Sequence, residues 1–503
     1  MTTRAVAASA LELPPPAVTL QLGVPGPPPM PIVGPLGNVA RFVLDPLGHA
    51  ERLFWRYGRM ACLARGASTW LVSTEANPPG TVLFYGAELN RQVFSQAATY
   101  HKSSLTGPLY PQGEVGARRR PLTRMFAGLF GVNDDAHRTH RRLLLPAFHK
   151  SRVEGYRDDM VAIVESVLAG FVPGQERDLW LDMNELTLRV ATRTLFGSDL
   201  GPRAVELGRK LQRWLELFKY AGAGALDLPG LPYWRWLNVT HELDRDMRWI
   251  IAQKRRGVGD RRDILAALLE AKDEQGAALS EDDLIGHASV LFAAGHETSS
   301  NALSWTLAVL SQHPGIAADL HDELWSKLRG DAPTVQQLAE LPLLDGVVKV
   351  SMRLLPSVPL NHRIVAVDCE LDGHTLPRNT ELISSVYHTH RVPEIYAEPQ
   401  RFLPTRWETL EPGPYAYSPF GGGPRMCIGA SFALMEIKLV LAMLLQRFRL
   451  ALPPDARVDR SISITMRPSP HLRMSVHAQD REFAAGARGV RGDLARMVDL
   501  PAI

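Results

Sequence analysis

A cysteine at the end of a glycine-rich loop has the surroundings expected of a metal ligand. The loop, residues 420–429, reads Phe-Gly-Gly-Gly-Pro-Arg-Met-Cys-Ile-Gly, and an apolar pattern from about Gly429 to Phe448 predicts that a helix follows. A thiol at a helix N-terminus meets the positive end of the helix dipole, which favours the thiolate, the form that binds metals. The glycines would let a flat cofactor approach the backbone. Cys62 and Cys369 lack these surroundings, so we interpret them as small buried hydrophobic residues.

A second group of polar residues lies in the middle of a long predicted helix. Ser280 and Asp283 form a capping-box pattern, and the helical pattern runs over residues 281–313, where Pro314 ends it. At 1.5 Å per residue this helix would be about 50 Å long and would cross the whole molecule. Gly295 in its interior costs roughly 1 kcal/mol relative to alanine. We therefore expect a ligand to approach the helix closely at this glycine.

The cysteine loop resembles the haem-thiolate signature of the cytochromes P-450, F-x-x-G-x-R-x-C-x-G. Its fixed positions, which would bind the haem, are met by Phe420, Gly423, Arg425, Cys427 and Gly429. The resemblance extends over about residues 25–476 and implies a mainly α-helical fold with a minor β-sheet region. It also implies that haem b lies between the long central helix and the helix after the loop. Cys427 would then be the axial ligand of the haem iron, where a thiolate helps to cleave the O–O bond of dioxygen.

The centre of the long helix resembles the oxygen-binding groove of the same family, A-G-x-(D/E)-T. The match is Ala294-Gly295-His296-Glu297-Thr298, which implies that Ala294 and Gly295 contact the haem. Glu297 and Thr298 would be the catalytic pair, because a hydroxyl beside a carboxylate can hold a water and pass protons to bound dioxygen. A helix threonine can instead bond to the carbonyl group one turn back. We interpret His296 as structural or pocket-lining.

The two haem propionates would need cationic partners if they are buried. By the same resemblance, His137 and Arg141 match a family H-x-x-x-R motif, and they lie one helical turn apart on one face. Arg363 and Arg425 are the other candidates. The alternative for each arginine alone is a solvated surface position.

One family motif is incomplete, because the glutamate of E-x-x-R is replaced by Val350 while its arginine, Arg353, is present. That glutamate normally joins Arg353 to a second structural arginine, here Arg406. Removing one partner from a buried ion network commonly costs about 3–5 kcal/mol. Asp345 and Glu408 are the nearby candidates to replace it. The hypothesis predicts that Val350→Glu raises thermal stability or haem occupancy.

The substrate pocket that the resemblance implies is mostly apolar. This favours a lipophilic substrate such as a fatty acid, a terpenoid or a macrolide-like polyketide, as in secondary metabolism. Each of these residues could equally be plain core. The pocket residues are Phe126, Leu129, Phe130, Ala293, Val358, Leu360 and Ile464.

Composition narrows the class of protein that positions these residues. The chain has 503 residues, a net charge of +3, 45% hydrophobic and 22% charged residues, so it is neither disordered, fibrous nor drawn to nucleic acid by its charge. Three scattered cysteines exclude a disulfide framework and indicate a reducing cytoplasm. The prolines and glycines of residues 13–40 exclude a membrane-spanning helix, and we expect no transmembrane anchor.

The chain divides into three predicted parts. Residues 1–46 form a proline-rich lead-in, residues 47–476 a single haem-thiolate monooxygenase domain, and residues 477–503 a loosely held tail. Strand-like runs occur near residues 61–72, 82–85, 363–371 and 381–386.

Electrons would come from a separate ferredoxin and its reductase, because the chain contains no G-x-G-x-x-G or flavin pattern. A basic face made by Arg138, Arg142 and Lys349 would attract the acidic donor. We expect a monomeric enzyme that uses O2 to hydroxylate or epoxidise its substrate. Two alternatives remain: a peroxygenase or isomerase with the same haem-thiolate site, and a non-catalytic haem-binding protein in which Val350 marks decay.

Overall fold

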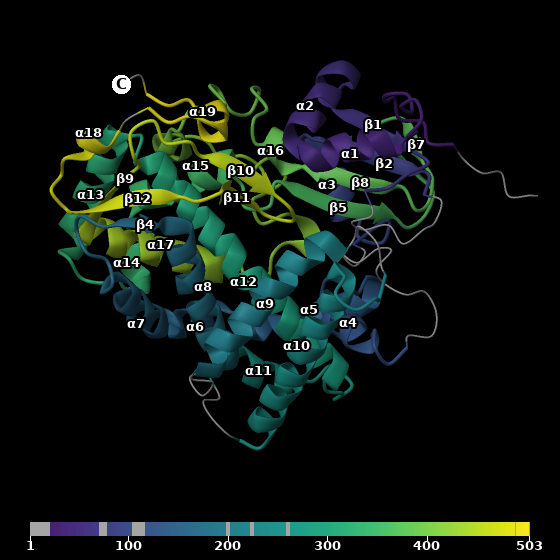
Figure 1. Ribbon diagram of the computed structural model, residues 1–503, viewed down its shortest axis with the longest axis horizontal. Coiled ribbons are helices and arrows are strands. Elements are labelled where there is room, and N and C mark those ends of the chain that lie inside the picture. The colour runs from purple at the N-terminus through teal and green to yellow at the C-terminus, as the bar shows by residue number, and fades with distance from the viewer. Residues whose placement is uncertain are drawn as a thin grey trace, which may run out of the picture.

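The computed structural model describes residues 21–69, 78–102, 116–197, 202–221, 226–257, 262–487 and 489–501. Helices form most of it, as Figure 1 shows. The helices are α1 Leu36–Leu44, α2 Pro46–Tyr57, α3 Ala87–Ser95, α4 Arg120–Met125, α5 Asp134–Leu144, α6 Lys150–Gly155, α7 Arg157–Leu168, α8 Leu179–Phe196, α9 Pro202–Ala221, α10 Pro232–Arg255, α11 Ile264–Glu270, α12 Glu281–Leu310, α13 Pro314–Leu328, α14 Val335–Ala339, α15 Pro342–Leu354, α16 Val386–Thr389, α17 Ala430–Arg447, α18 Phe483–Gly486 and α19 Asp493–Met497. Short 3-10 helices include η2 Leu145–Phe148, η4 Pro404–Glu408 and η5 Gly423–Arg425.

The strands are short and form four separate sheets among the described residues. They are β1 Met60–Arg65, β2 Gly80–Phe84, β3 Tyr100–His101, β4 Glu176–Asp178, β5 Leu360–Val365, β6 Cys369–Leu371, β7 His374–Leu376, β8 Glu381–Ser385, β9 Phe448–Ala451, β10 Asp459–Ile462, β11 Met466–Ser469 and β12 Arg473–Ala478. The fold class predicted from the sequence, mainly α with a minor sheet, is confirmed.

The long helix α12 forms the centre of the helical part. Its N-terminus has the predicted capping box, with Asp283 N–H donating to Ser280 Oγ at 3.1 Å. It ends at Leu310, three residues before the predicted end, because Pro314 already starts α13 and residues 311–313 form the connecting turn. Helices α8, α15 and α17 pack against it, so α12 joins elements from the middle and the C-terminal part of the chain (Figure 1).

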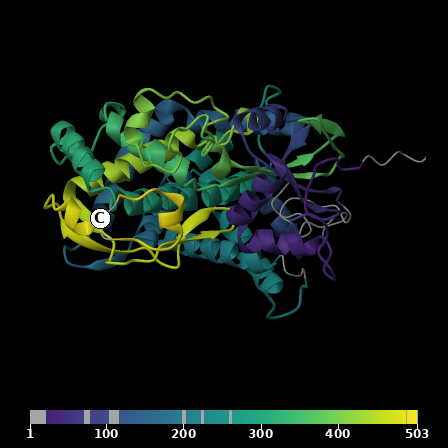
Figure 2. The ribbon, with the colours of Figure 1, turned by 90° about the horizontal axis from the view of Figure 1, so that it is seen from above.

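The largest sheet lies at the side of the molecule that also holds α1, α2 and α3 (Figures 1 and 2). Its strand order is β1-β2-β8-β5-β3, with β2 and β8 parallel and the other pairs antiparallel. The strand-like runs predicted from the sequence correspond to β1, β2, β5 with β6, and β8. Residues 70–72 of the first run lie outside the described residues. Pairing of β3 with β5 sets His101 opposite Ile364, and this brings residues 100–102 beside the strand that carries Arg363.

The predicted lead-in is part of the fold from its first described residues onward. Pro25 O accepts a hydrogen bond from Cys62 N–H at 2.7 Å, and Leu22 and Val24 are buried beside the sheet. Helix α1 packs Val39 and Phe42 into the main core. The described part of this lead-in therefore packs with the residues after it, because proline-rich extended backbone can still pair with a strand through its carbonyl groups.

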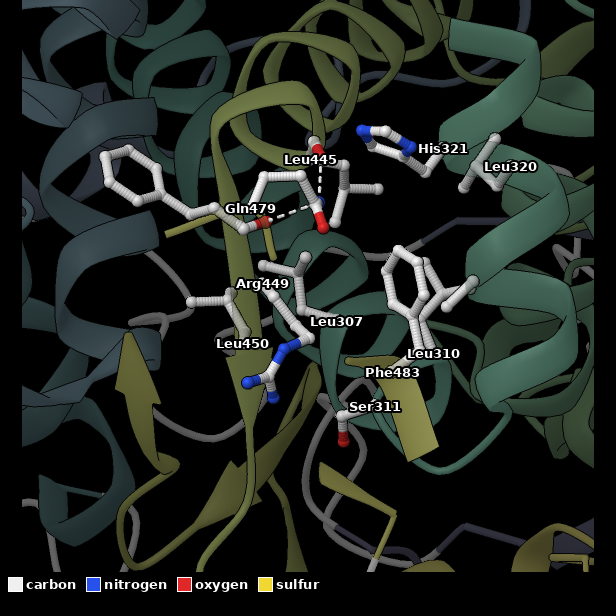
Figure 3. A pocket seen from close by; sticks show the side chains of 12 residues that line it. Leu307, Leu310, Ser311, Leu320, His321, Leu445, Arg449, Leu450, Gln479 and Phe483 are labelled. Carbon is white, nitrogen blue, oxygen red and sulfur yellow. Dashed lines mark hydrogen bonds between the residues drawn. The ribbon is translucent and has the colours of Figure 1, made fainter. Parts of the chain in front are cut away.

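The expectation of a loosely held tail is wrong for the described residues. Gln479 and Phe483 line a small cavity of about 30 Å³ at the C-terminal end of α12. Figure 3 shows the side chains around it. The Gln479 side-chain amide donates to Leu445 O at 2.8 Å. Further on, Leu494 and Met497 are buried in the main core. Spaced apolar residues therefore anchor a segment whose composition looks flexible.

None of the described helices is both long enough and apolar enough to cross a membrane.

Candidate functional site

Cys427 lies between η5 and the N-terminus of α17, as the sequence predicted. Its backbone N–H donates to Phe420 O at 2.9 Å, which closes the loop. Gly421 and Gly423 have φ values of +73° and +65°, a region that favours glycine. A side chain at Gly423 would also collide with the carbonyl group of Phe94. At Gly429, by contrast, a Cβ atom would meet only the Phe148 ring at 3.7 Å, so protein packing does not require this glycine.

Two opposing effects set the acidity of the Cys427 thiol. Although part of Cys427 is open to solvent, protein atoms surround it closely, and this desolvation raises the pKa of the thiol. The Gly429 N–H group and the positive charges of Arg141 and Lys102 lower it again, but only in part. The helix terminus thus favours the thiolate, as the sequence predicts, but burial outweighs it and raises the pKa of the thiol overall. A metal ion would be needed to hold this sulfur deprotonated.

A cluster of buried and half-buried basic side chains surrounds the cysteine. Its members come from four separate parts of the chain: the end of β3, helix α5, strand β5 and the cysteine loop. They are Lys102, His137, Arg141, Arg363 and Arg425, and we call them the cation cluster.

Burial lowers the pKa of every member of the cation cluster, and repulsion by neighbouring cations adds to this in every member except Arg141. The pKa of Lys102 falls to about 7, mainly by burial and then by Arg363 and Arg425. Burial, followed by Arg425, lowers the pKa of Arg363 and of His137 to about 10 and about 4 respectively. None of the described acidic residues forms an ion pair with Lys102, Arg141 or Arg363. Such a cluster is complementary to a buried group with more than one negative charge.

Arg425 is fixed by backbone acceptors from the segment before α5. It donates to Leu129 O at 3.1 Å and to Val132 O at 2.6 Å, and it also bonds to Asn133 Oδ1. These bonds join the cysteine loop to the segment that carries the predicted pocket residues Leu129 and Phe130. Its pKa is lowered to about 10, chiefly by burial.

Glu297 and Thr298, the predicted catalytic pair, lie in the middle of α12, where both side chains are half-buried. Thr298 Oγ1 donates to Ala294 O at 2.8 Å, so the alternative of a bond one turn back is the arrangement observed. The carboxylate of Glu297 accepts from Thr465 Oγ1 at 2.9 Å. The carbonyl of Thr298 accepts from Ser357 Oγ at 2.8 Å. The pair thus contacts both the turn after α15 and the β10–β11 hairpin.

Gly295 and His296 take different roles on α12. A Cβ atom at Gly295 would meet only Ala191 Cβ at 3.8 Å, so the surrounding protein does not require a glycine here. His296 is buried, bonds through Nδ1 to Phe292 O at 3.1 Å, and accepts through its carbonyl group from Thr187 Oγ1. The structural interpretation of His296 therefore agrees with its contacts.

The predicted pocket residues divide into core and half-buried positions. Phe126, Leu129 and Leu360 belong to the main hydrophobic core, and the Phe126 ring packs on Trp214 at 5.4 Å. Phe130 lies under the Lys102 ammonium group, 4.2 Å from it. Ala293, Val358 and Ile464 are half-buried. The last two adjoin Ser357 and Thr465, which bond directly to the centre of α12.

Arg353 is held by backbone carbonyl groups where the family motif would supply a carboxylate. It is fully buried and donates to His390 O at 2.9 Å, Pro399 O at 2.7 Å and Arg401 O at 3.2 Å. Arg406 donates to Glu398 O at 3.2 Å. Burial, reinforced by Arg391 and Arg406, lowers the pKa of Arg353 to about 9.

Neither proposed replacement for the missing glutamate reaches Arg353. Asp345 pairs with Lys349 at 2.7 Å and with Lys438, and Glu408 is exposed. The predicted replacements are therefore wrong, because carbonyl groups can solvate a buried guanidinium without a counter-ion.

Two functional candidates were missed in the sequence analysis. Lys102 joins the cation cluster only because β3 pairs with β5, a long-range contact with no local sequence signal. Glu436 on α17 is buried, and this burial raises its pKa to about 8, while Ser299 on α12 offsets part of the rise. An acidic residue among the apolar positions of a helix is the signal that could have found Glu436.

The predicted basic face is weaker than its charges suggest. Arg138 pairs with Asp135, Arg142 with Glu274, and Lys349 with Asp345. Each cation is thus partly neutralised within the chain.

Comparisons with known proteins define the class of this molecule. The cytochrome P450 family model matches residues 24–473. A putative cytochrome P450 139 of Mycobacterium tuberculosis is 30% identical over 444 residues, which cover 86% of this chain and 98% of the relative. Cyclooctat-9-en-7-ol 5-monooxygenase of Streptomyces melanosporofaciens is 29% identical over 415 residues, or 80% and 87% of the two chains. The solved structure of retinoic acid-bound cyanobacterial CYP120A1 has the same fold, with a TM-score of 0.74 at 24% identity, covering 91% of this chain and all of that one.

The fold and the matching family model are those of haem-thiolate proteins. The chain belongs to the cytochrome P450 family, whose members bind haem and use O2. The residues present fit the cofactor: Cys427 could supply a thiolate ligand beside the cation cluster, in which Lys102, Arg141 and Arg363 pair with no described carboxylate. Protein packing requires neither Gly295 nor Gly429, so both positions leave room for a flat group.

Proposed function

We propose that this chain is a monooxygenase that binds haem b through Cys427 and inserts one atom of O2 into a lipophilic substrate. The observation that supports this proposal best is the cation cluster around Cys427. Its positive charges, shielded from water, are complementary to the two carboxylates of haem. Haem, when bound, supplies the redox chemistry of dioxygen activation. The protein's own residues then bind the cofactor, exclude water and deliver protons.

Each part of the site has an assigned role in this proposal. Phe420, Gly423 and Gly429 shape the loop around Cys427. His137, Arg141, Arg363, Arg425 and Lys102 hold the propionates. Ala294 and Gly295 leave room on α12.

Glu297 and Thr298 form the proton-delivering pair. For this role the Thr298 hydroxyl must exchange its bond to Ala294 O for a bond to a water or ligand, which requires only a rotation about χ1. Glu297 is already oriented by Thr465.

The wall of the predicted pocket supports a lipophilic class of substrate. Its half-buried residues Ala293, Val358 and Ile464 are apolar and uncharged, which supports a lipophilic compound such as a fatty acid, terpenoid or polyketide. A relative of this chain is a monooxygenase of the alcohol cyclooctat-9-en-7-ol, which supports a terpenoid-like substrate. A cytoplasmic, monomeric enzyme supplied by a separate ferredoxin and reductase completes the proposal.

The carbon-monoxide difference spectrum of the reduced protein tests the axial ligand. We expect a strongly red-shifted Soret band in the native chain and its loss in Cys427→Ala. An unshifted band in the native chain would contradict thiolate ligation.

Turnover then separates the monooxygenase from the peroxygenase alternative. We expect oxidation of lipophilic probes with ferredoxin, reductase and O2, and much slower oxidation with peroxide alone. The reverse order would favour a peroxygenase.

A further inference from the structure

His390 lies between helix α15, which carries Arg353, and the segment that leads to Cys427. It is the residue after α16 and is fully buried. Its carbonyl group accepts from Arg353 Nη1 at 2.9 Å, and its ring atom Nδ1 lies 3.1 Å from Arg353 O. Two hydrogen bonds of opposite direction therefore connect His390 and Arg353.

The other nitrogen of the His390 ring, Nε2, contacts the start of the cysteine loop at Ser418. Ser418 N–H donates to His390 Nε2 at 2.9 Å. Ser418 O in turn accepts from Gly421 N–H at 3.0 Å, which forms the first turn of the loop. The His390 ring also stacks on Tyr417, with ring centroids 5.4 Å apart and planes at 28°.

These contacts fix the tautomer of His390. Because Nε2 accepts the Ser418 N–H group, the ring proton must be on Nδ1, where it donates to Arg353 O. Burial, reinforced by the charges of Arg353 and Arg391, lowers the pKa of His390 to about 3, so the ring is neutral. A neutral Nδ1–H imidazole thus bridges two backbone segments with one donor and one acceptor.

We propose that His390 is a positioning residue that connects Arg353 to the Cys427 loop through its hydrogen bonds. In this chain it takes over a stabilising role that a glutamate at position 350 would otherwise have. The inference rests on the proposed haem-thiolate function. It assigns a role to a residue outside the haem site: His390 orients residues 418–421, and these residues set the position from which Cys427 approaches the iron.

Two substitutions separate the two hydrogen bonds of the ring. His390→Gln places an amide oxygen near the position of Nε2, so it keeps the acceptor for Ser418 N–H. His390→Asn places its amide near Nδ1, so it keeps the donor to Arg353 O and loses the acceptor. His388→Asn is the matched control, since this histidine lies two residues away, bonds to Ser385 Oγ at 2.7 Å and packs on Phe54 and Tyr85.

The test is the carbon-monoxide difference spectrum of the reduced, haem-loaded full chain, together with haem content per chain. We expect His390→Asn to lower the red-shifted fraction at least fivefold at unchanged haem content. His390→Gln should retain more than half of it, and His388→Asn should match the native chain. Equal spectra for His390→Asn and the native chain, or equal losses in His390→Asn and His388→Asn, would overturn the proposal.

Amide hydrogen exchange provides a readout that does not depend on the axial ligand. In a peptide covering residues 416–421 of the full chain, we expect exchange at Ser418 to be at least tenfold faster in His390→Asn than in His390→Gln. Equal rates would refute the link even if the spectra differ. A native chain without the red-shifted band would instead refute the proposed function, while the exchange result would still decide the role of His390.

Discussion

Restoring a glutamate at position 350 is the sharpest test of how this chain replaces the incomplete family motif. Gly346, Val350 and Arg353 are spaced by four and three residues, so they share one face of α15. That face packs on η4, since a Cβ atom at Gly346 would lie 2.7 Å from Pro404 O. The Nε–H groups of Arg353 and Arg406 are buried there, and neither has a hydrogen-bond acceptor among the described residues. A carboxylate at position 350 would therefore meet two free donors.

The expected gain in the free energy of unfolding is small, because new hydrogen bonds stabilise the variant while lost apolar burial and desolvation destabilise it. Two hydrogen bonds to charged groups contribute about 3–6 kcal/mol together. Losing the buried Val350 side chain costs about 1.5–3 kcal/mol, and desolvation of the new carboxylate removes most of the remainder. We predict that Val350→Glu raises the free energy of unfolding by about 1 kcal/mol and raises haem content per chain.

Urea unfolding followed by circular dichroism measures this effect, with Val350→Gln as the control of equal shape. The amide brings no charge and leaves part of its own polar group unpaired, so we expect it to lower stability by about 1–2 kcal/mol. If Val350→Glu is destabilised as much as Val350→Gln, the carbonyl groups already satisfy the two arginines and the reasoning is refuted.

Three further predictions concern single residues of the site. Gly423→Ala should reduce haem content at least fivefold, because the φ of +65° at this position and the contact with Phe94 exclude a side chain. The control variant Gly429→Ala should keep the loop folded. Equal haem content in the two variants would contradict the strain argument. Lys102→Gln should weaken haem binding about tenfold in a haem-transfer assay, roughly 1.4 kcal/mol, and unchanged binding would remove Lys102 from the propionate partners. The pKa of Glu436 is raised to about 8 in the folded chain, so the folded state binds more protons than the unfolded state, and stability should fall as pH rises from about 4.5 through 8. Glu436→Gln should reduce this fall by more than about 1 kcal/mol between pH 5 and pH 8, and a parallel pH profile in both proteins would show that Glu436 does not titrate with folding.

Local patterns predicted the elements that have strong local causes. The capping box at Ser280 and the helix after Cys427 have such causes, and both begin where expected. The strands after Phe448 were missed, although Met474 and Val476 alternate with polar residues in β12, because the alternation covers only a few residues.

The parts of the site that could not be predicted depend on long-range pairing. Lys102 reaches the cation cluster through the β3–β5 pair, and Arg353 finds carbonyl groups that lie 37 to 48 residues further along the chain. A motif reports which side chain is missing, but the tertiary fold decides which backbone groups take its place.

The hydrogen bonds that join α12 to its neighbours have a consequence for laboratory evolution of this protein. Thr465 lies next to the pocket residue Ile464 and bonds to Glu297, while Ser357 lies next to Val358 and bonds to the carbonyl group of Thr298. A change that enlarges the pocket at either place therefore shifts the groups assigned to proton delivery. Mutations that broaden the substrate range should therefore show epistasis with residues 297 and 298. Libraries that vary only the pocket wall should lose both selectivity and coupling efficiency, the fraction of reducing electrons that ends in product.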